Sequence, residues 1–415
     1  MSLSTRIFYD SSNHMHRDIQ YHPEQSARID ACLDALSAYM KTSSQHLDLI
    51  DVSPVGQVSQ QHNWFLEPFP DADLEYARQI LIDIHSAELV ESLETKCRES
   101  RQRRTDEGKS ALGFIGYLDD DTYITTESFN VCLRAAACWI ECANLVLNSE
   151  RNFSFALTRP PGHHATKNLP NGFCTFNFAA AASVHAMKNP GCEKITILDW
   201  DVHYGQGVAD IVADLSNIRY VSMHQVPAFP YTGQSRGVHG KHKNILTVPI
   251  APDSSWACGY HELFTEKVLP FCSSPDWEPD LIIVCSGYDA LSSDELASCS
   301  LVAEDYGKMT RLLRDYLGDS AKIMFGLEGG KRVQLQHMRL LHRFHIILNT
   351  RLTTCIILSM QTNERNLNLL LPCDIPRIST KTKCTWRKSS RCRRRDGQSS
   401  EMRNYITPKQ LKIYT

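Results

Sequence analysis

The stretch of sequence that decides the fold is KITILDWDVHYGQG, residues 194–207. Its first half is a run of β-branched and apolar residues, which is typical of a strand buried on both faces of a parallel sheet. Its second half turns polar and Gly-rich, with Asp199, Asp201 and His203 spaced two apart. In an open α/β sheet, ligands bind at the carboxyl ends of the strands. The stretch therefore predicts a strand that brings reactive side chains to that edge.

The same pattern recurs along the chain from residue 154 onward. Runs of strand type alternate there with helical stretches, as expected for βαβ units and a parallel sheet. The predicted strands are 154–158, 194–200, 218–224, 244–250, 280–287 and 322–330. The predicted helices are 24–40, 126–148, 171–188, 205–215, 256–272 and 302–317. The polar segment 97–124 is predicted to be a loop or a broken helix.

Five of these strands run into a polar or Gly-rich motif. The motifs are RPPGHHA (159–165), DWDVHYGQG (199–207), MHQVPAFPYTG (223–233), CSGYDA (285–290) and GLEGG (326–330). Parallel strands present their carboxyl ends at one edge of the sheet, so the five motifs are expected to converge on one site.

Three residues of these motifs form a metal-ligand pattern. Asp201 and His203 are two apart at a strand end, which places both side chains on the same face. Asp289 ends a second buried strand. Two carboxylates and one imidazole, without a thiolate, are the donor set of a catalytic zinc site that leaves positions open. The competing interpretation is a chance Asp-x-His pattern with Asp289 as a helix N-cap.

The tandem pair His163 and His164 follows the rigid turn Pro160-Pro161-Gly162. Imidazoles are the usual general acid and base near neutral pH, and a metal-activated water beside one can attack a carbonyl. Two surface histidines in a loop are the alternative. The predicted metal ligands at the same edge favour a catalytic pair.

The charge of the chain changes abruptly after Gly330. Residues 331–415 hold 18 Lys/Arg and 4 Asp/Glu, a net charge of +14, whereas residues 1–330 carry −17. The fifteen cysteines form no CxxC pair and are predicted to be core thiols. An uninterrupted apolar stretch of about 18 residues is absent, and the N-terminus does not resemble a secretory leader, so no membrane partner is expected.

At this level of detail the chain resembles the histone deacetylase family. The motifs RPPGHHA, NGFCTFN (171–177), DWDVHYGQG, FPYTG (229–233), SGYDA (286–290) and LEGG (327–330) have the order and spacing of that family, and HPEQSARI (22–29) is similar to its N-terminal signature. The wording is closer to the class II branch than to class I. The resemblance implies an arginase-like, three-layer α/β fold with a mostly parallel eight-stranded sheet flanked by helices, as one catalytic domain over residues 7–330.

The resemblance also implies roles for individual residues. Asp201, His203 and Asp289 would bind zinc. His164 would be the general base that deprotonates the zinc-bound water, and His163 would stand beside the leaving amine. Asp199 would orient His163, and Gln206 would stand next to the second histidine, where class I enzymes use an aspartate.

A tunnel and a second cation site follow from the same resemblance. Phe173 and Phe229 would form the walls of a narrow tunnel for the acyl-lysine stem, with Gly172 at its side and Leu296 at its rim. The family's structural monovalent-cation site, assigned to potassium (K⁺), matches Asp199, Asp201, His203, Ser222 and Met223.

The chain departs from the family pattern at Lys331. In the family a tyrosine follows LEGG and donates a hydrogen bond to the substrate carbonyl opposite zinc, and loss of one such donor typically costs about 10²–10³ in rate. Three interpretations of the basic tail 331–415 stay open. The first is a misassigned end of the sequence. The second is a genuine segment that binds acidic partners or nucleic acid, or that directs nuclear import. The third is a solvated, disordered extension.

Three functions are compatible with these observations. The first is a zinc-dependent deacetylase acting on acetyl-lysine in histones or other proteins. The second is an acetylpolyamine deacetylase, which is disfavoured because Leu296 stands where such relatives carry a glutamate at the rim. The third is a catalytically impaired, zinc-binding interaction protein, motivated by Lys331. A cytoplasmic or nuclear location is expected by default.

Overall fold

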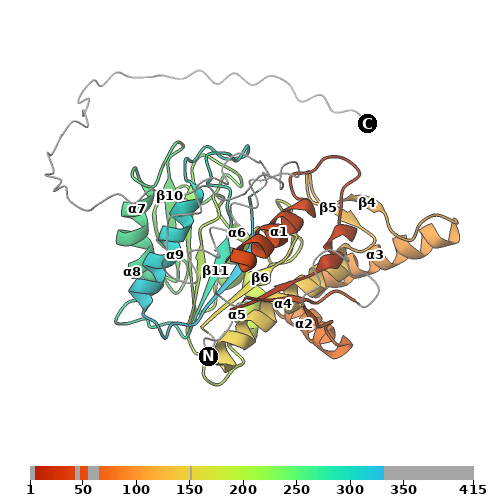
Figure 1. The fold of residues 1–415 in the computed structure, drawn as a ribbon, viewed down its shortest axis with the longest axis horizontal. Helices are drawn as coiled ribbons and strands as arrows, with labels where there is room; N and C mark the ends of the chain where they lie inside the picture. Colours follow the sequence, from red (N-terminus) through yellow and green to blue (C-terminus); the bar gives the residue numbers. More distant parts are fainter. Residues whose placement is uncertain (1–4, 43–46, 55–64, 150–151, 331–415) are drawn as a thin grey trace, which may run out of the picture. The chain divides into compact units, whose positions relative to one another are not determined.

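The computed structural model describes residues 5–42, 47–54, 65–149 and 152–330 (Figure 1). Lys331 and the basic tail lie outside the described residues. The described strands form one large sheet of order β3-β2-β1-β6-β12-β11-β7-β8-β10-β9 and one two-stranded hairpin, β4-β5.

Eight strands of five to eight residues form the parallel body of the large sheet. In spatial order they are β2 (Leu47–Asp51), β1 (Thr5–Tyr9), β6 (Phe153–Leu157), β12 (Ile323–Leu327), β11 (Leu281–Ser286), β7 (Ile195–Asp199), β8 (Ile218–Gln225) and β10 (Ile245–Ile250). Two short edge strands complete the sheet: β3 (Phe65–Leu66) is parallel to β2, and β9 (Gly237–His239) is antiparallel to β10. The predicted mostly parallel, eight-stranded body is therefore confirmed, with two edge strands added.

Helices cover both faces of this sheet (Figure 1). On one face lie α2 (Asp71–Ile84), α3 (Ala87–Asp106), α4 (Ser128–Asn148), α5 (Phe178–Ala186) and α6 (Gln206–Val212). On the other lie α1 (Ala27–Thr42), α7 (Tyr260–Leu263), the π-helical turn η2 (Phe264–Val268), α8 (Leu269–Cys272) and α9 (Ala303–Leu317). A short 3-10 helix, η1 (Ser11–Met15), follows β1.

The period-two alternation of the buried strands explains the three layers. In β7, Ile195 and Ile197 belong to the core beneath α4 and α5, whereas Leu198 and the following Trp200 belong to the core beneath α1 and α9. Each buried strand therefore supplies side chains to two hydrophobic cores, which is why its sequence is a continuous apolar run.

Helix α4 is long and apolar enough, by length and composition, to span a membrane. In this structure it is a core helix, because most of its side chains are buried, including Trp139 at 0% exposure. Both α2 and α5 pack against it. A buried helix of a globular domain has the same hydropathy as a membrane span.

Most predicted boundaries differ from the structure by a few residues, and two predicted elements differ more. Residues 171–177 form a tight turn and a loop, and α5 begins only at Phe178, where the Asn177 side chain accepts a hydrogen bond from the Ala180 N–H (3.0 Å). The segment 97–124 is not a simple loop, because α3 continues to Asp106. Its buried stripe is narrow, since only five of its twenty residues are buried, and the predominantly polar composition hid the helix.

The hairpin of β4 (Phe114–Tyr117) and β5 (Tyr123–Thr125) also lies in this segment and was not predicted. The N-terminal strands β1 and β2 were likewise missed, because each is a short run that contains charged residues. The cysteine prediction is confirmed for the described residues, which contain no disulfide; ten of their eleven cysteines are buried.

Candidate metal centre and catalytic site

The five motif-bearing strands are neighbours in space. The sheet order places β6, β12, β11, β7 and β8 side by side and parallel, although they are separated by up to 170 residues of sequence. All five motifs therefore emerge at the same edge, and the predicted convergence is seen in the structure.

Asp201, His203 and Asp289 come together at the ends of β7 and β11. One possible ligand atom from each lies within 4.8 Å of the others. His203 Nδ1 is 3.2 Å from Asp201 Oδ1 and 3.0 Å from Asp289 Oδ2, and all three residues are buried. Burial disfavours the imidazolium form, but hydrogen bonds to Asp201 and Asp289 outweigh it and raise the pKa of His203 to about 9.

Two glycines make room for these carboxylates. A Cβ at Gly287 would lie 2.0 Å from Asp201 Oδ2, and one at Gly329 would lie 2.3 Å from Asp289 Oδ2 and 2.4 Å from Asp201 Oδ2. The Gly329 N–H also donates to Asp201 Oδ2 (2.7 Å). Neither glycine was predicted from the sequence to support the metal ligands. Their spacing from the aspartates carried no signal, because the contacts join different strands.

The donor set and its surroundings fit a divalent cation. Two buried carboxylates repel each other unless a positive charge lies between them. The proton on His203 supplies that charge here, and a divalent cation would supply it in the proton's place. Neutral imidazole and carboxylate ligands with open positions are those of catalytic zinc. No thiolate belongs to the group.

His163 is held as a cation by two carboxylates. Its Nδ1 is 3.0 Å from Asp199 Oδ2, and its Nε2 is 3.7 Å from Asp201 Oδ1. Burial alone would lower the pKa of His163, but Asp201 and then Asp199 raise it to about 10. Asp199 is itself fixed by the Tyr220 hydroxyl, which donates to Asp199 Oδ2 (2.8 Å). Tyr220 is a site residue that the sequence analysis missed.

His164 is held in the neutral form. Burial, followed by the positive charges of His163 and His203, lowers its pKa well below the ordinary value. Its Nδ1 donates to Gln206 Oε1 (2.6 Å), and the Gln206 amide donates to the His164 carbonyl and to Asn171 Oδ1 (both 3.2 Å). The amide orientation is therefore fixed, and the free lone pair of His164 lies on Nε2.

The two imidazoles thus differ in charge although they are adjacent. Their ring centroids are 3.9 Å apart. Environments that push two neighbouring pKa values apart assign one group as acid and the other as base. His164 can accept a proton at neutral pH, and His163 cannot.

Glu328 is a second residue that the sequence analysis did not assign to the site. Its Oε2 accepts hydrogen bonds from the N–H groups of Gly162 (2.7 Å) and His163 (3.1 Å), which fixes the turn that carries the histidine pair. Burial is the main reason why its pKa is raised to about 7. Glu328, His163 and Cys174 also form a second group that has metal-ligand spacing.

Phe229 and Gly172 lie against the histidines. The Phe229 ring is 4.9 Å from the His164 ring and 6.4 Å from the His203 ring, measured between centroids. A Cβ at Gly172 would lie 2.7 Å from Phe229 Cε1 and 2.8 Å from His164 Cδ2. Phe173 follows in the same turn and packs edge-on against His22 at 4.7 Å.

The other predicted site residues are less closely tied to this centre. Leu296 is 48% exposed on the loop after β11, and its place at a tunnel rim stays a prediction. Ser222 and Met223 are buried in β8, where Ser222 pairs with Asp199 in the sheet and its hydroxyl is 2.9 Å from His224 Nδ1. The potassium site stays a prediction, because these contacts do not support it.

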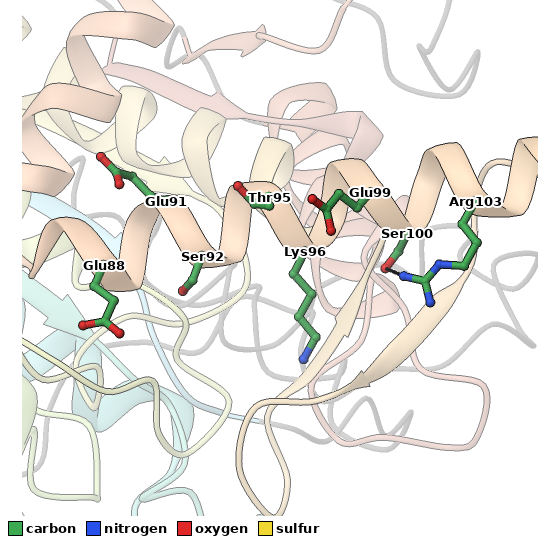
Figure 2. A pocket seen from close by; sticks show the side chains of 8 residues that line it. All are labelled: Glu88, Glu91, Ser92, Thr95, Lys96, Glu99, Ser100 and Arg103. Carbon is green, nitrogen blue, oxygen red and sulfur yellow. Dashed lines mark hydrogen bonds between the residues drawn. The ribbon is translucent and has the colours of Figure 1, made fainter.

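A surface hollow lies elsewhere, along α3 (Figure 2). All its lining side chains belong to that helix, among them Glu88, Lys96 and Arg103. They carry charges of both signs, and none of the predicted site residues lines it. The hollow is therefore separate from the candidate metal centre.

Comparisons with known proteins agree with this geometry. The model of the histone deacetylase domain family matches residues 22–342. An uncharacterized protein of the cyanobacterium Synechocystis is 37% identical over 324 residues, covering 78% of this chain and 93% of the relative. The chloroplastic histone deacetylase 14 of Arabidopsis thaliana is 31% identical over 341 residues, covering 79% and 73%.

Two solved structures share the fold. The HD domain of HDA15 superposes with a TM-score of 0.66 at 25% identity, covering 86% of this chain and 88% of that one. An acetylpolyamine aminohydrolase from Burkholderia pseudomallei gives a TM-score of 0.63 at 18% identity, covering 86% and 97%. At 18% identity the second likeness shows the fold alone.

Proposed function

The chain belongs to the histone deacetylase family, and we propose that it is a zinc-dependent deacetylase that hydrolyses the amide of acetyl-lysine in histones or other proteins. The observation that supports this proposal best is the pairing of a buried Asp-His-Asp group with two adjacent imidazoles, one cationic and one neutral. The proposed catalytic domain is residues 7–330.

Asp201, His203 and Asp289 would hold the metal. When bound, a zinc ion supplies Lewis acidity to an amide carbonyl and lowers the pKa of water. The absence of side chains at Gly287 and Gly329 leaves the two carboxylates the space that they occupy. A Cys-rich structural site would instead be closed on all sides by protein ligands.

The chain's own residues would move the protons. His164 Nε2 accepts a proton from the attacking water, because Gln206 holds the other nitrogen as a donor. The water oxygen forms a bond to the acyl carbon, the carbon–nitrogen bond breaks, and His164 returns the proton to the lysine amine. The products are acetate and free lysine. His163, held cationic by Asp199 and Asp201, stabilises the negative charge that develops in the transition state.

The aromatic residues favour a neutral, extended substrate stem. Phe229 packs edge-on against His164, Gly172 lies close to both rings, and Phe173 is the next residue. An acylated lysine has lost its charge and can be desolvated between such side chains, whereas a free lysine would lose its hydration without a partner. Leu296 is apolar and offers no carboxylate to a polyamine, so we propose acetyl-lysine in preference to an acetylated polyamine.

The test combines metal analysis with turnover. The purified full-length chain is expected to bind one zinc per chain and to cleave an acetyl-lysine peptide faster than acetylspermidine, in a reaction that a hydroxamate inhibits. A chain without tightly bound zinc would contradict the proposal. Zinc and hydroxamate binding without turnover would instead support the impaired, zinc-binding interaction protein that Lys331 suggests. A cytoplasmic or nuclear location stays a prediction.

A further inference from the structure

The turn Asn171–Cys174 has an unusual backbone. Its ends exchange two hydrogen bonds, Asn171 N–H to Cys174 O (3.0 Å) and Cys174 N–H to Asn171 O (2.9 Å). Both central residues have positive φ, Gly172 at 53° and Phe173 at 69°. These features are those of a type I′ turn, which favours Gly, Asn or Asp at both central positions.

Phenylalanine is therefore a strained choice at the second position. A bulky L-residue at positive φ persists only where the surrounding structure holds it there. The first central position of the turn must be glycine, because a Cβ at Gly172 would clash with the side chains of Phe229 and His164. Contacts from outside the turn are needed to keep the Phe173 ring in place.

Such contacts come from the β4–β5 hairpin, some fifty residues earlier in the chain. The Gly172 N–H donates to Asp119 Oδ2 (3.2 Å), and the Phe173 N–H donates to Thr122 Oγ1 (2.9 Å). The Thr122 hydroxyl donates in turn to Asp119 Oδ2 (2.9 Å), and Asp119 Oδ1 accepts from the Asp121 N–H (2.9 Å). Each hydroxyl, carboxylate and backbone group in this circuit has a partner of the correct kind. Thr122 is 1% exposed.

The same turn is coupled to the N-terminal loop that carries His22 and, through Gln206, to His164. His22 packs edge-on against Phe173 and its Nε2 is 3.1 Å from the Asp121 carbonyl, which ties the N-terminal loop to the hairpin turn. On the other side, Asn171 Oδ1 accepts a hydrogen bond from the Gln206 amide that orients His164. A shift of the turn would therefore move Phe173 directly and His164 indirectly, through Asn171 and Gln206.

We propose that Thr122 and Asp119 are positioning residues that set the Phe173 wall of the substrate tunnel. The identity of the ligand, an acyl-lysine stem, rests on the proposed function. The hydrogen bonds from Asp119 and Thr122 to the Gly172 and Phe173 N–H groups, here called the brace, are a property of the fold. The hydrogen bonds of Thr122 join it to Asp119, Leu118 and Phe173, so its effect on the ligand is exerted through the Phe173 backbone.

The brace is tested first without any ligand. Thr122→Val keeps the shape of the side chain and removes the hydroxyl, whereas Thr122→Ser keeps the hydroxyl. Hydrogen exchange of the Gly172 and Phe173 amides, measured on the full-length chain, is expected to become about tenfold faster in Thr122→Val and to stay near wild type in Thr122→Ser. Thr265→Val, which removes an η2 hydroxyl that donates to the His261 carbonyl of α7 (2.8 Å), is the matched control.

The ligand arm compares two hydroxamates on the zinc-loaded chain. A hydroxamate with a six-carbon stem contacts the tunnel walls, whereas acetohydroxamate has no stem. Thr122→Val is expected to weaken the first by about tenfold, or about 1.4 kcal/mol, and to leave the second and the zinc content unchanged. With an acetyl-lysine peptide the effect should appear in KM rather than in kcat.

The outcomes separate the two proposals. Unchanged amide exchange in Thr122→Val, or equal loss of both hydroxamates, would overturn the brace. A wild-type chain that binds neither zinc nor hydroxamate would overturn the proposed function while the exchange measurement still decides the brace. If Thr122→Val does not fold, Asp119→Asn, which turns an acceptor into a donor opposite the Gly172 N–H, is measured in the same way.

Discussion

At the scale of single residues, the site depends as much on absent side chains as on present ones. Gly287 and Gly329 leave no room for a Cβ beside the carboxylates of Asp201 and Asp289. The Gly329 N–H also orients Asp201. Glycine is required at these positions because of close approach, since neither residue has a positive φ.

Gly329→Ala is expected to lower the zinc affinity by about 10–100-fold, the range seen when the support of a metal ligand is lost. The added methyl would push apart the two oxygens that it meets at 2.3 and 2.4 Å. Competitive titration with a chelator measures the change. Gly191→Ala, whose Cβ would meet nothing closer than 3.6 Å, is the control. Equal zinc affinities in the two variants would refute the role of Gly329 in making room for the metal-binding carboxylates.

The residue after Gly330 is the second decisive position. The Gly330 carbonyl accepts a hydrogen bond from Arg28 Nε (2.7 Å), which holds the last described residue in place. A tyrosine at position 331 would supply the phenolic hydroxyl that the family uses as a hydrogen-bond donor and that Lys331 does not have. Lys331→Tyr is expected to raise kcat by about 10²-fold or more without changing the zinc content.

Steady-state kinetics on an acetyl-lysine peptide checks this prediction. Lys241→Tyr, at a position whose side chain is 71% exposed, is the control and should leave kcat unchanged. If Lys331→Tyr gives no gain, the missing donor is not what limits turnover.

At the scale of elements, a buried ion pair holds the histidine motif in place. Arg159, at the end of β6, donates from Nε and Nη2 to the two oxygens of Glu24, both at 2.6 Å. The Tyr123 hydroxyl of β5 donates to Glu24 Oε2 (2.9 Å). Arg159 Nη1 donates to the carbonyls of Asn13 and His16 (both 2.7 Å). The network joins three segments that are far apart in sequence.

This network predicts a loss of stability in acid. Burial would raise the pKa of Glu24, but Arg159 outweighs it and lowers the pKa from 4.5 to about 2. Burial, followed by Arg159, lowers the pKa of His16 from 6.5 to about 3. In both cases the unfolded chain binds the proton more readily, so their contributions are complete above pH 6.5. The free energy of unfolding should fall as the pH drops from 6.5 towards 3, and more steeply below 4.5.

Glu24→Gln is expected to destabilise the chain at pH 7 by about 3–5 kcal/mol, because the buried Arg159 charge loses its partner. It should also flatten the pH dependence below 4.5. Urea unfolding at pH 7 and pH 4 measures both effects. Glu107→Gln, which removes an exposed partner of Lys109, should match wild type at both pH values. If the free energy of unfolding of Glu24→Gln fell below pH 4.5 as steeply as that of wild type, Glu24 would not be the group responsible for the loss of stability in acid.

At the scale of the whole molecule, the sheet order gathers the chemistry. The strands β6, β12, β11, β7 and β8 are adjacent, and each contributes a motif to one edge. One hydrophobic core on each face of the sheet holds these strands in register. A metal bound at this edge links strands β7 and β11 and neutralises buried carboxylates, so it should stabilise the entire domain.

Zinc removal is therefore expected to lower the melting temperature. A ligand that binds only the folded state stabilises it by about 4 kcal/mol at a thousandfold excess over Kd. Thermal unfolding with and without a chelator measures the shift. Asp289→Ala should abolish the response to zinc. A melting temperature that does not change on chelation would contradict a metal site at this edge.

The sequence by itself determined the class of the fold and the chemical nature of the site. Buried parallel strands have continuous apolar runs, and Asp201 and His203 two apart share one face whatever the rest of the chain does. These signals are local, so they survive without tertiary information. The ends of α3 and α5 could not be predicted from such local signals, because capping by Ser86 and Asn177 and burial against α4 decide where these helices begin and end.

Only the tertiary structure decided the spatial order of the strands, the cationic state of His163 beside the neutral His164, the close approach of Gly287 and Gly329 to the carboxylates, and the partner of Arg159. The pKa of a buried imidazole depends on which carboxylates lie within a few ångströms, and these come from other strands. Glu24 and Arg159 are 135 residues apart, and Thr122 and Phe173 are 51 apart. Such contacts depend on how the sheet and its loops pack, and no local pattern in the sequence encodes them.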